Sequence, residues 1–225
     1  MGYGVKFKVW GDYACFSRPE LKVERVSYDM ITPSAARGLI ESVYWKPAII
    51  WTIDKIHVIN PIKFTNIRRN EVKQVARLNR IKKTAETKEP YYIESNKCRH
   101  QRAAMVLTNV MYVIEAHFEL NKENAGETDT IEKHYNIALR RLRNGQYFSK
   151  PCLGTREFGA EFAILEDGEM PKSALHGEMD LGYMLYDIGY SLNEKKDRIA
   201  VDPKFFRAKL IDGVLDLTTD VEVVE

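Results

Sequence analysis

Two amphipathic helical segments, each lying between strand-like segments, constrain the fold of this chain more than any other feature. Residues 32–45 open with Thr32 and Pro33, a favourable cap and first-turn pair, and continue with an apolar stripe at helical spacing. Residues 129–145 show the same kind of stripe and carry several arginines toward their end. Both stretches therefore predict helices that bury one face.

Four strand-like segments complete the pattern. Residues 5–10 alternate apolar and polar side chains, and residues 48–67 are rich in Ile, Val and Trp, which indicates one long strand or two short ones. Residues 104–120 and 157–165 supply two more strands. The order βαββαβ predicts an α+β domain of the ferredoxin-like type, with a four-stranded antiparallel sheet and two helices on one face. RNA-recognition (RRM) domains share this arrangement, although a fold does not by itself define a function.

Charge and pattern both change about three quarters of the way along the chain. Residues 1–165 hold 27 Lys and Arg against 18 Asp and Glu, whereas residues 166–225 hold 7 against 14. A basic body is compatible with a polyanionic partner, but equally with chance and solubility. Because only short strand-like pieces follow, we predict a ferredoxin-like domain at 1–167 and a small antiparallel β-sheet domain at 168–225.

Much of the positive charge lies in residues 66–102, which hold 11 Lys and Arg against 4 Asp and Glu and few large aliphatic residues. This composition predicts an exposed insertion, either a hairpin or a mobile loop. Its cations are either a solvated face or phosphate contacts along an RNA stem, which proteins recognise largely by shape and backbone. The candidate RNA contacts, including three on the second helix and in the glycine-bearing loop after it, are Arg68, Arg69, Lys82, Lys83, Arg99, Arg102, Arg140, Arg141 and Arg156.

The second helix opens with an unusual pair. Lys133 and His134 follow the expected cap, Asp129, in the first turn, where the helix dipole is already positive. The apolar stripe places His134 at the border of core and solvent, with Lys133 farther out. One interpretation is a partly buried histidine bonded to a neighbour, beside a solvated lysine. The other is a phosphate site at the helix N-terminus, with His134 suited to move protons near pH 7.

A lysine and a histidine at a phosphate site suit RNA cleavage without a metal ion. The ribose 2′-OH would attack the adjacent phosphorus, the lysine would stabilise the negative charge, and a proton donor would assist the leaving 5′-oxygen. None of the five histidines is paired with a second ligand at a closed zinc-site spacing, and neither a Walker loop nor G-x-G-x-x-G after a strand is present. We therefore expect no metal and no cofactor.

Cysteine usage and hydropathy bear on location. Three widely separated cysteines do not form a disulfide framework, and no run approaches the roughly 20 apolar residues that cross a bilayer. We expect a cytoplasmic protein of a prokaryote that does not contact a membrane.

The most specific sequence signal is a combination of motifs: ESVYWKP, IRRNEV and the helix-opening KHY. Around these motifs, five stretches covering most of residues 5–165 resemble the CRISPR-associated protein 5 family in its subtype I-C (Dvulg) form, within the repeat-associated mysterious protein (RAMP) superfamily. The stretches are FKVWGDYACFSRPE (7–20), TPSAARGLIESVYWKPAIIW (32–51), FTNIRRNEV (64–72), RHQRAAMVLTNVMYVIEAHF (99–118) and KHYNIALRRLRNGQYFSKPCLGTREFGAEF (133–162).

The resemblance implies a metal-independent endoribonuclease that cuts precursor CRISPR RNA at the repeat hairpin. It also implies that the mature guide RNA stays bound within a surveillance complex containing other CRISPR-associated subunits. The family's Tyr, Lys, His group falls on Tyr44, Lys133 and His134, of which the residues alone had indicated only the last two. We expect His134 to act as general acid or base, Lys133 to stabilise charge, and Tyr44 to orient the 2′-OH or the phosphate.

Two alternatives stay open at this point. The chain could be a non-catalytic subunit that holds the 5′ handle of the guide. Other branches of the family resemble such a subunit. A ferredoxin-like metabolic enzyme is disfavoured by the basic body and the absence of a cofactor loop. Binding to duplex DNA is also open, because charge alone does not distinguish sugars. Cleavage should give a 2′,3′-cyclic phosphate or 3′-phosphate and a 5′-hydroxyl.

Overall fold

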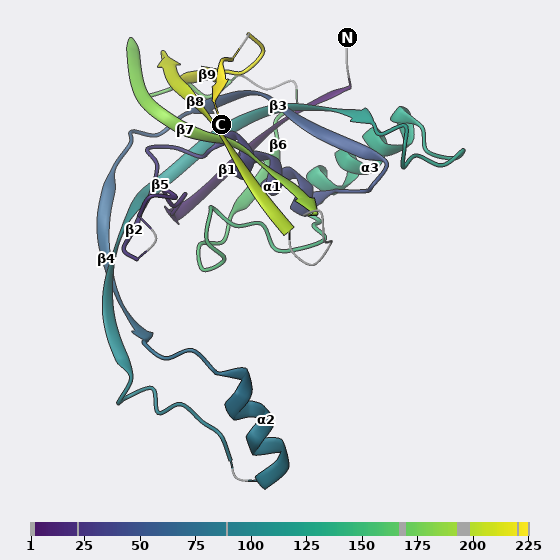
Figure 1. Ribbon diagram of the computed structural model, residues 1–225. Coiled ribbons are helices and arrows are strands. Elements are labelled where there is room, and N and C mark those ends of the chain that lie inside the picture. Colours follow the sequence, from purple (N-terminus) through teal and green to yellow (C-terminus); the bar gives the residue numbers. More distant parts are fainter. Residues whose placement is uncertain are drawn as a thin grey trace.

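A curled, almost entirely antiparallel sheet forms most of the molecule (Figure 1). The computed structural model describes residues 3–21, 23–88, 90–166, 170–192, 199–219 and 221–224. Its helices are α1 (Pro33–Val43), α2 (Leu78–Thr87) and α3 (Ile131–Arg143). Its strands are β1 (Gly4–Ala14), β2 (Arg25–Val26), β3 (Ile49–Val58), β4 (Phe64–Val72), β5 (Arg99–Leu120), β6 (Glu161–Ile164), β7 (Glu178–Leu192), β8 (Ile199–Ile211), β9 (Val214–Asp216) and β10 (Val223–Val224).

Strand β5 is the centre of the body of the sheet. It pairs with β1 on one side and β3 on the other, and β6 joins the free edge of β1, all antiparallel. The strand order of the body is therefore β3-β5-β1-β6. Val5, Phe7 and Val9 of β1 are buried while the side chains between them are not, which is the alternation that predicted this strand.

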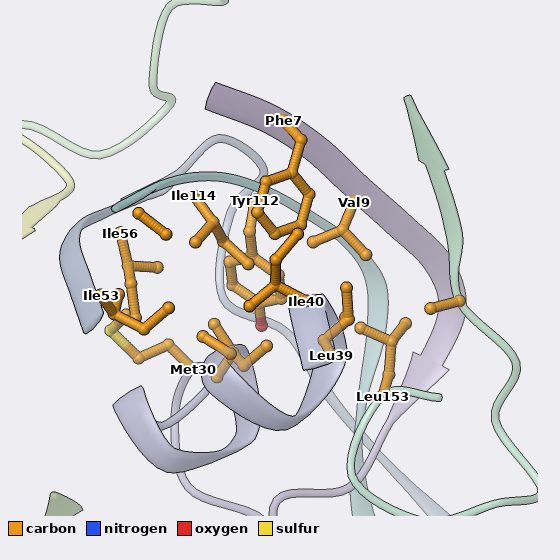
Figure 2. Close-up of a cluster of buried hydrophobic side chains, with 14 of the residues drawn as sticks. Phe7, Val9, Met30, Leu39, Ile40, Ile53, Ile56, Tyr112, Ile114 and Leu153 are labelled. Carbon is orange, nitrogen blue, oxygen red and sulfur yellow. The ribbon is translucent and has the colours of Figure 1, made fainter. Parts of the chain in front are cut away.

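Helix α1 closes the hydrophobic core under the sheet. Thr32 caps it as predicted, since its hydroxyl accepts a hydrogen bond from the N–H of Ala35 at 3.2 Å. Leu39 and Ile40 on its buried face lie against Phe7 and Val9 of β1, as Figure 2 shows. Each fully buried aliphatic or aromatic side chain of this kind contributes about 1.5–3 kcal/mol. The core therefore fixes where α1 ends, which matters for the site described below.

The basic insertion is a hairpin that carries a helix at its tip. Strand β4 pairs with the first half of β5, from Phe64 opposite Leu107 to Val72 opposite Arg99, and α2 lies beyond them (Figure 1). We call residues 64–107 the arm. The hairpin alternative is confirmed, but α2 was not predicted, because it has few apolar residues in a strongly basic stretch and none of its residues is buried.

Strand β5 belongs to both the body and the arm. Its 22 residues span roughly 70 Å at about 3.3 Å per residue. Asn109 lies at the point where β5 stops pairing with β3 and starts pairing with β4. Its φ of 49° is a left-handed conformation that asparagine tolerates. The side-chain amide of Asn60 donates to the carbonyl of Asn109 at 2.8 Å. The strand predicted at 104–120 begins earlier because its pairing with β4 extends it to Arg99.

The C-terminal pieces join the same sheet. The predicted short segments are two long strands, β7 and β8, and β8 continues through Pro203. Proline is tolerated there because β10 pairs with β8 only at Phe205 and Phe206, which leaves Pro203 on an edge within the described residues. Strand β9 pairs with β3, so the body sheet continues into this region. The predicted domain boundary after residue 167 falls outside the described residues.

Candidate active site

Tyr44, Lys133 and His134 come from two segments that the core brings together. Tyr44 is the residue that ends α1: its N–H donates to the carbonyl of Ile40 at 2.9 Å, and its own carbonyl accepts from the indole N–H of Trp51 at 2.9 Å. Lys133 and His134 lie in the first turn of α3. Two helix ends, each fixed by core packing, therefore define the geometry of the group.

The phenol and the imidazole are in direct contact. The hydroxyl of Tyr44 lies 2.7 Å from Nδ1 of His134, although the two residues are 90 positions apart in the sequence. Both are buried, with only 2% of each residue exposed. The expectation that His134 lies at the border of core and solvent is therefore wrong. The rings of Tyr44 and Phe118, with centroids 6.0 and 6.5 Å from that of His134, enclose it.

The start of α3 also differs from the prediction. Thr130, not Asp129, is the cap: its hydroxyl accepts from the N–H of Lys133 at 3.2 Å. Glu132 lies in the first turn of α3, and its carboxylate accepts from the hydroxyl of Tyr3 at 3.0 Å. The carboxylate of Asp129 is free of the cap and turns toward the candidate site.

Asp129 occupies the position that the sequence assigned to a phosphate. Its Oδ1 accepts from the ammonium of Lys133 at 2.9 Å and lies 3.3 Å from Nε2 of His134. Its Oδ2 accepts from the N–H of Gly126 at 3.0 Å. Lys133, with 43% of its side chain exposed, also donates to the carbonyl of Thr128 at 3.1 Å. An internal carboxylate thus lies where Lys133 and the helix end favour an anion.

Burial keeps the phenol and the imidazole neutral. It raises the pKa of Tyr44 above its ordinary value near 10, an effect that the guanidinium of Arg141 opposes and Asp129 reinforces. It lowers the pKa of His134 below its ordinary value near 6.5, an effect that Asp129 opposes and that Lys133 and Lys46 reinforce. At neutral pH the site therefore contains an uncharged Tyr–His pair between an anion and several cations.

The predicted RNA contacts fall into two groups. Arg69 donates to Glu157 at 2.6 Å, Arg102 pairs with Glu71 at 3.2 Å, and Arg141 donates to the carbonyl of Val43 at 2.7 Å. These three are therefore engaged within the protein. The others are exposed and form no ion pair with any residue that the structure describes: Arg68, Lys82, Lys83, Arg99, Arg140 and Arg156.

The exposed cations do not form one surface. Lys82 and Lys83 lie on α2 at the far end of the arm from α3, which carries Arg140 (Figure 1). Arg68 and Arg99 lie on the stem of the arm, and Arg156 lies in the loop before β6. An RNA in contact with all of them would have to extend along the whole molecule.

Two hollows are lined by basic residues, most of which the sequence analysis did not select. One, of about 590 Å³, lies in the arm and is lined by Lys73, Arg77, Arg80 and Lys97 among others. The other, of about 630 Å³, lies between α1 and residues 149–156, and Lys150 and Arg156 line it. The charge excess of residues 66–102 contained the signal for the first hollow. For the second hollow, the sequence analysis had selected Arg156 in the glycine-bearing loop but not Lys150.

Two structural features bear on the classes of protein considered above. Within the described ranges, no group of three or more His, Cys, Asp or Glu side chains is placed to hold a metal ion. In the same ranges, no helix combines the length and the apolar character that crossing a bilayer requires.

A family model described as CRISPR-associated protein (Cas_Cas5), or Cas_Cas5d, matches residues 4–218. The chain belongs to the Cas5d family. It is 44% identical to the CRISPR pre-crRNA endoribonuclease Cas5d of Mannheimia succiniciproducens, over 96% of each chain. It is 38% identical to the protein of the same name from Thermus thermophilus, over 96% of this chain and 92% of the relative.

Solved structures agree with this Cas5d assignment at the level of fold. A crystal structure of a CRISPR-associated protein has a TM-score of 0.68 at 22% identity, covering 96% of this chain and 92% of that one. A protein from Streptococcus mutans also has a TM-score of 0.68, at 21% identity, covering 99% and 97%. The mixed α/β architecture with a curled antiparallel sheet is thus shared with a solved structure of a CRISPR-associated protein.

Proposed function

We propose that this Cas5d-family protein is an endoribonuclease that cleaves precursor CRISPR RNA at the repeat hairpin. The observation that carries the proposal is the 2.7 Å contact between Tyr44 and His134, with Lys133 beside it. The names of the Mannheimia and Thermus relatives, which describe pre-crRNA endoribonucleases, support the same activity. The sequence resemblance assigns catalysis to these three residues, and the fold brings two of them into hydrogen-bonding distance.

The proposed reaction needs no metal ion. The ribose 2′-oxygen forms a bond to the adjacent phosphorus and the bond to the 5′-oxygen breaks, which leaves a 2′,3′-cyclic phosphate and a 5′-hydroxyl. The ammonium of Lys133 stabilises the negative charge on the phosphorane, and the Tyr44–His134 pair transfers the proton. Because both rings are buried, the scissile phosphate reaches them only after the residues that cover them move aside.

The proposed RNA path joins the site to the arm. The exposed cations of the arm and the hollow lined by Lys150 and Arg156 are open to a phosphate backbone. We further propose that the protein keeps the mature guide as a subunit of a type I-C surveillance complex in a prokaryotic cytoplasm. The three cysteines are free, which suits a reducing compartment. Duplex DNA is a second candidate ligand of the same cations.

We also propose how the fold divides. Strands β1, β3, β5 and β6 with helices α1 and α3 have the order of a ferredoxin-like βαββαβ domain, extended by the arm. The C-terminal β-rich part, from residue 168, would be a small domain that packs on this unit through β9.

One observation favours a second function, that of a non-catalytic subunit that holds the guide RNA. Tyr44 and His134 are each only 2% exposed, so RNA bound at the surface would not touch either ring. The same cations would then hold the guide without cutting it.

Cleavage of repeat RNA in EDTA separates the two functions. The purified chain is incubated with its own repeat RNA, and cleavage and Kd are measured for wild type, His134→Ala, Tyr44→Phe and Lys133→Ala. Lys122→Ala, which removes an exposed lysine of the preceding loop, is the matched control. We expect the three site variants to lose activity by on the order of 100-fold or more while retaining RNA binding.

Each other outcome points elsewhere. Binding without cleavage by the wild type would support the guide-holding subunit. Loss of activity in EDTA, or a 5′-phosphate product, would contradict the metal-independent mechanism.

A further inference from the structure

One buried nitrogen at the site has no hydrogen-bond partner. Nδ1 of His134 faces the hydroxyl of Tyr44, but Nε2 is buried and forms no hydrogen bond of acceptable geometry with the described residues. Oδ1 of Asp129 lies 3.3 Å from it. A neutral imidazole carries one hydrogen. If the protonated phenol donates to Nδ1, that hydrogen lies on Nε2 and points to Asp129.

Asp129 is held in place to act on this nitrogen. Its two oxygens are fixed by Lys133 and by the N–H of Gly126, and only 21% of its side chain is exposed. The hydrogen bond from Lys133 lowers the pKa of Asp129, so the carboxylate stays ionised near neutral pH. An anion beside Nε2 repels a lone pair and attracts an N–H. It therefore stabilises the tautomer that leaves Nδ1 free to accept the proton of Tyr44.

We propose that Asp129 is a positioning residue of the reaction, which holds His134 in the Nε2–H tautomer and so forms an Asp129–His134–Tyr44 relay. This inference rests on the proposed endoribonuclease function. Carboxylate, imidazole and hydroxyl follow the same order in hydrolase triads on unrelated folds. In the relay the phenol of Tyr44 exchanges a proton with the RNA, and His134 acts behind it.

The relay neither gains nor loses a proton over the reaction. The 2′-OH gives its proton to the oxygen of Tyr44 while the phenol gives its own to Nδ1 of His134, and the 2′-oxygen bonds to phosphorus. The imidazolium is stabilised by Asp129. As the bond to the 5′-oxygen breaks, the proton returns through Tyr44 to that oxygen. The net change is the transfer of one proton from the 2′-oxygen to the 5′-oxygen.

The charged groups around the ring make Asp129 necessary. Lys133 at the start of α3 and Lys46 after α1 both disfavour a charged imidazole. Phe118 of β5 is an uncharged ring at right angles to that of His134, and Arg141 lies over the ring of Tyr44, 5.2 Å from its centroid. Among the described residues that act on His134, Asp129 is the one that favours the imidazolium.

The test compares Asp129→Asn with Glu132→Gln. Both variants remove one carboxylate charge at the same helix start, but Glu132 bonds Tyr3 rather than the site. The ¹⁵N shifts of His134 in the RNA-free protein report the tautomer, and single-turnover cleavage with saturating RNA reports the rate separately from Kd. Asp129→Asn should lose the uniform Nε2–H state and slow cleavage by on the order of 100-fold, with Kd unchanged or lower. Glu132→Gln should change neither.

A second variant protects the test against misfolding. Asp129→Glu keeps the negative charge and should keep the Nε2–H tautomer. Asp129→Asn keeps an oxygen that can accept from the N–H of Gly126. An Asp129→Asn protein that cleaves as Glu132→Gln does, or faster than wild type, would overturn the relay. An Nδ1–H tautomer in the wild type would do the same. Failure of the wild type to cleave would remove the endoribonuclease function, while the NMR measurement would still report on Asp129.

Discussion

The burial of His134 links the chemistry of the site to the stability of the protein. Its pKa is lowered in the folded protein, whereas in the unfolded chain it lies near 6.5. As pH falls below 6.5, the unfolded chain binds a proton before the folded protein does. The free energy of unfolding therefore decreases through this range, until pH passes the folded pKa.

Replacing His134 should remove this pH dependence. In urea denaturation, we expect the stability advantage of the wild type over His134→Gln to be larger at pH 8 than at pH 5. His100→Gln is the control for the loss of a histidine that is exposed, on the arm, rather than buried. An advantage of the wild type that does not change with pH would show that His134 is not held neutral by the fold.

The sequence could select candidate site residues, but it could not predict their environment. Lys133 and His134 could be selected because a cation and an imidazole at a helix start are unusual. Tyr44 required the family resemblance, since a tyrosine at a helix end is usually part of the core. The role of Asp129 could not be predicted, because Asp129 and Thr130 are both good caps and only three-dimensional packing decides which of them caps α3.

At the scale of elements, the register of β4 against β5 separates two neighbouring arginines. Arg68 is exposed and forms no ion pair with the described residues, whereas Arg69 points to the other face, donates to Glu157 and lies over the ring of Phe158. Arg68→Gln should weaken RNA binding and reduce the slope of log Kd against log salt by about 1, without loss of stability.

Arg69→Gln is the matched comparison, because it removes the same charge one residue away. It should change the salt slope less and the melting temperature more. Salt slopes come from RNA titrations at several ionic strengths, and thermal unfolding reports stability. Equal slopes for Arg68→Gln and the wild type would exclude Arg68 from the RNA contact.

Elements were predictable from sequence where local chemistry is strong. The Thr32–Pro33 start gave α1, and alternation gave β1. Strand β5 was underestimated because its extension depends on β4. Helix α2 was missed because its few apolar residues lie in a strongly basic stretch and none of them is buried. Pro203 favoured two short segments over one strand in this region, but β8 continues through it because an edge position tolerates proline.

At the scale of the whole molecule, the arm and the body should be separable. Residues 73–98 lie beyond the paired positions Val72 and Arg99, and the described residues of α2 bury nothing against the body. Replacing 73–98 by Asn-Gly, which favours a two-residue hairpin turn, should leave the melting temperature within a few degrees of wild type.

The shortened protein should bind repeat RNA more weakly, with a smaller salt slope, because it lacks Lys82, Lys83 and the cations of the arm hollow. Cleavage at saturating RNA should persist, since the site lies in the body. A large drop in melting temperature would contradict the separation of arm and body. An unchanged salt slope would show that the RNA does not reach the tip.

The assembly of the sheet was the least predictable property. The short β9 joins the C-terminal strands to β3, and Met184, Phe206 and Leu210 belong to the same hydrophobic cluster as the body. Nothing local specifies which edge a three-residue strand will choose. Pairing between distant segments is decided by the packing of the finished core.

Strand β5 connects the arm to the body as one continuous strand. A hydrogen-bonded pair of strands resists bending along its length. A force applied at α2 is therefore transmitted along the arm to the point where Asn60 bonds Asn109. On the far side of that point, the same strand continues to Phe118, against the ring of His134. RNA bound at the tip would therefore act on a strand whose other end lies beside the imidazole of His134.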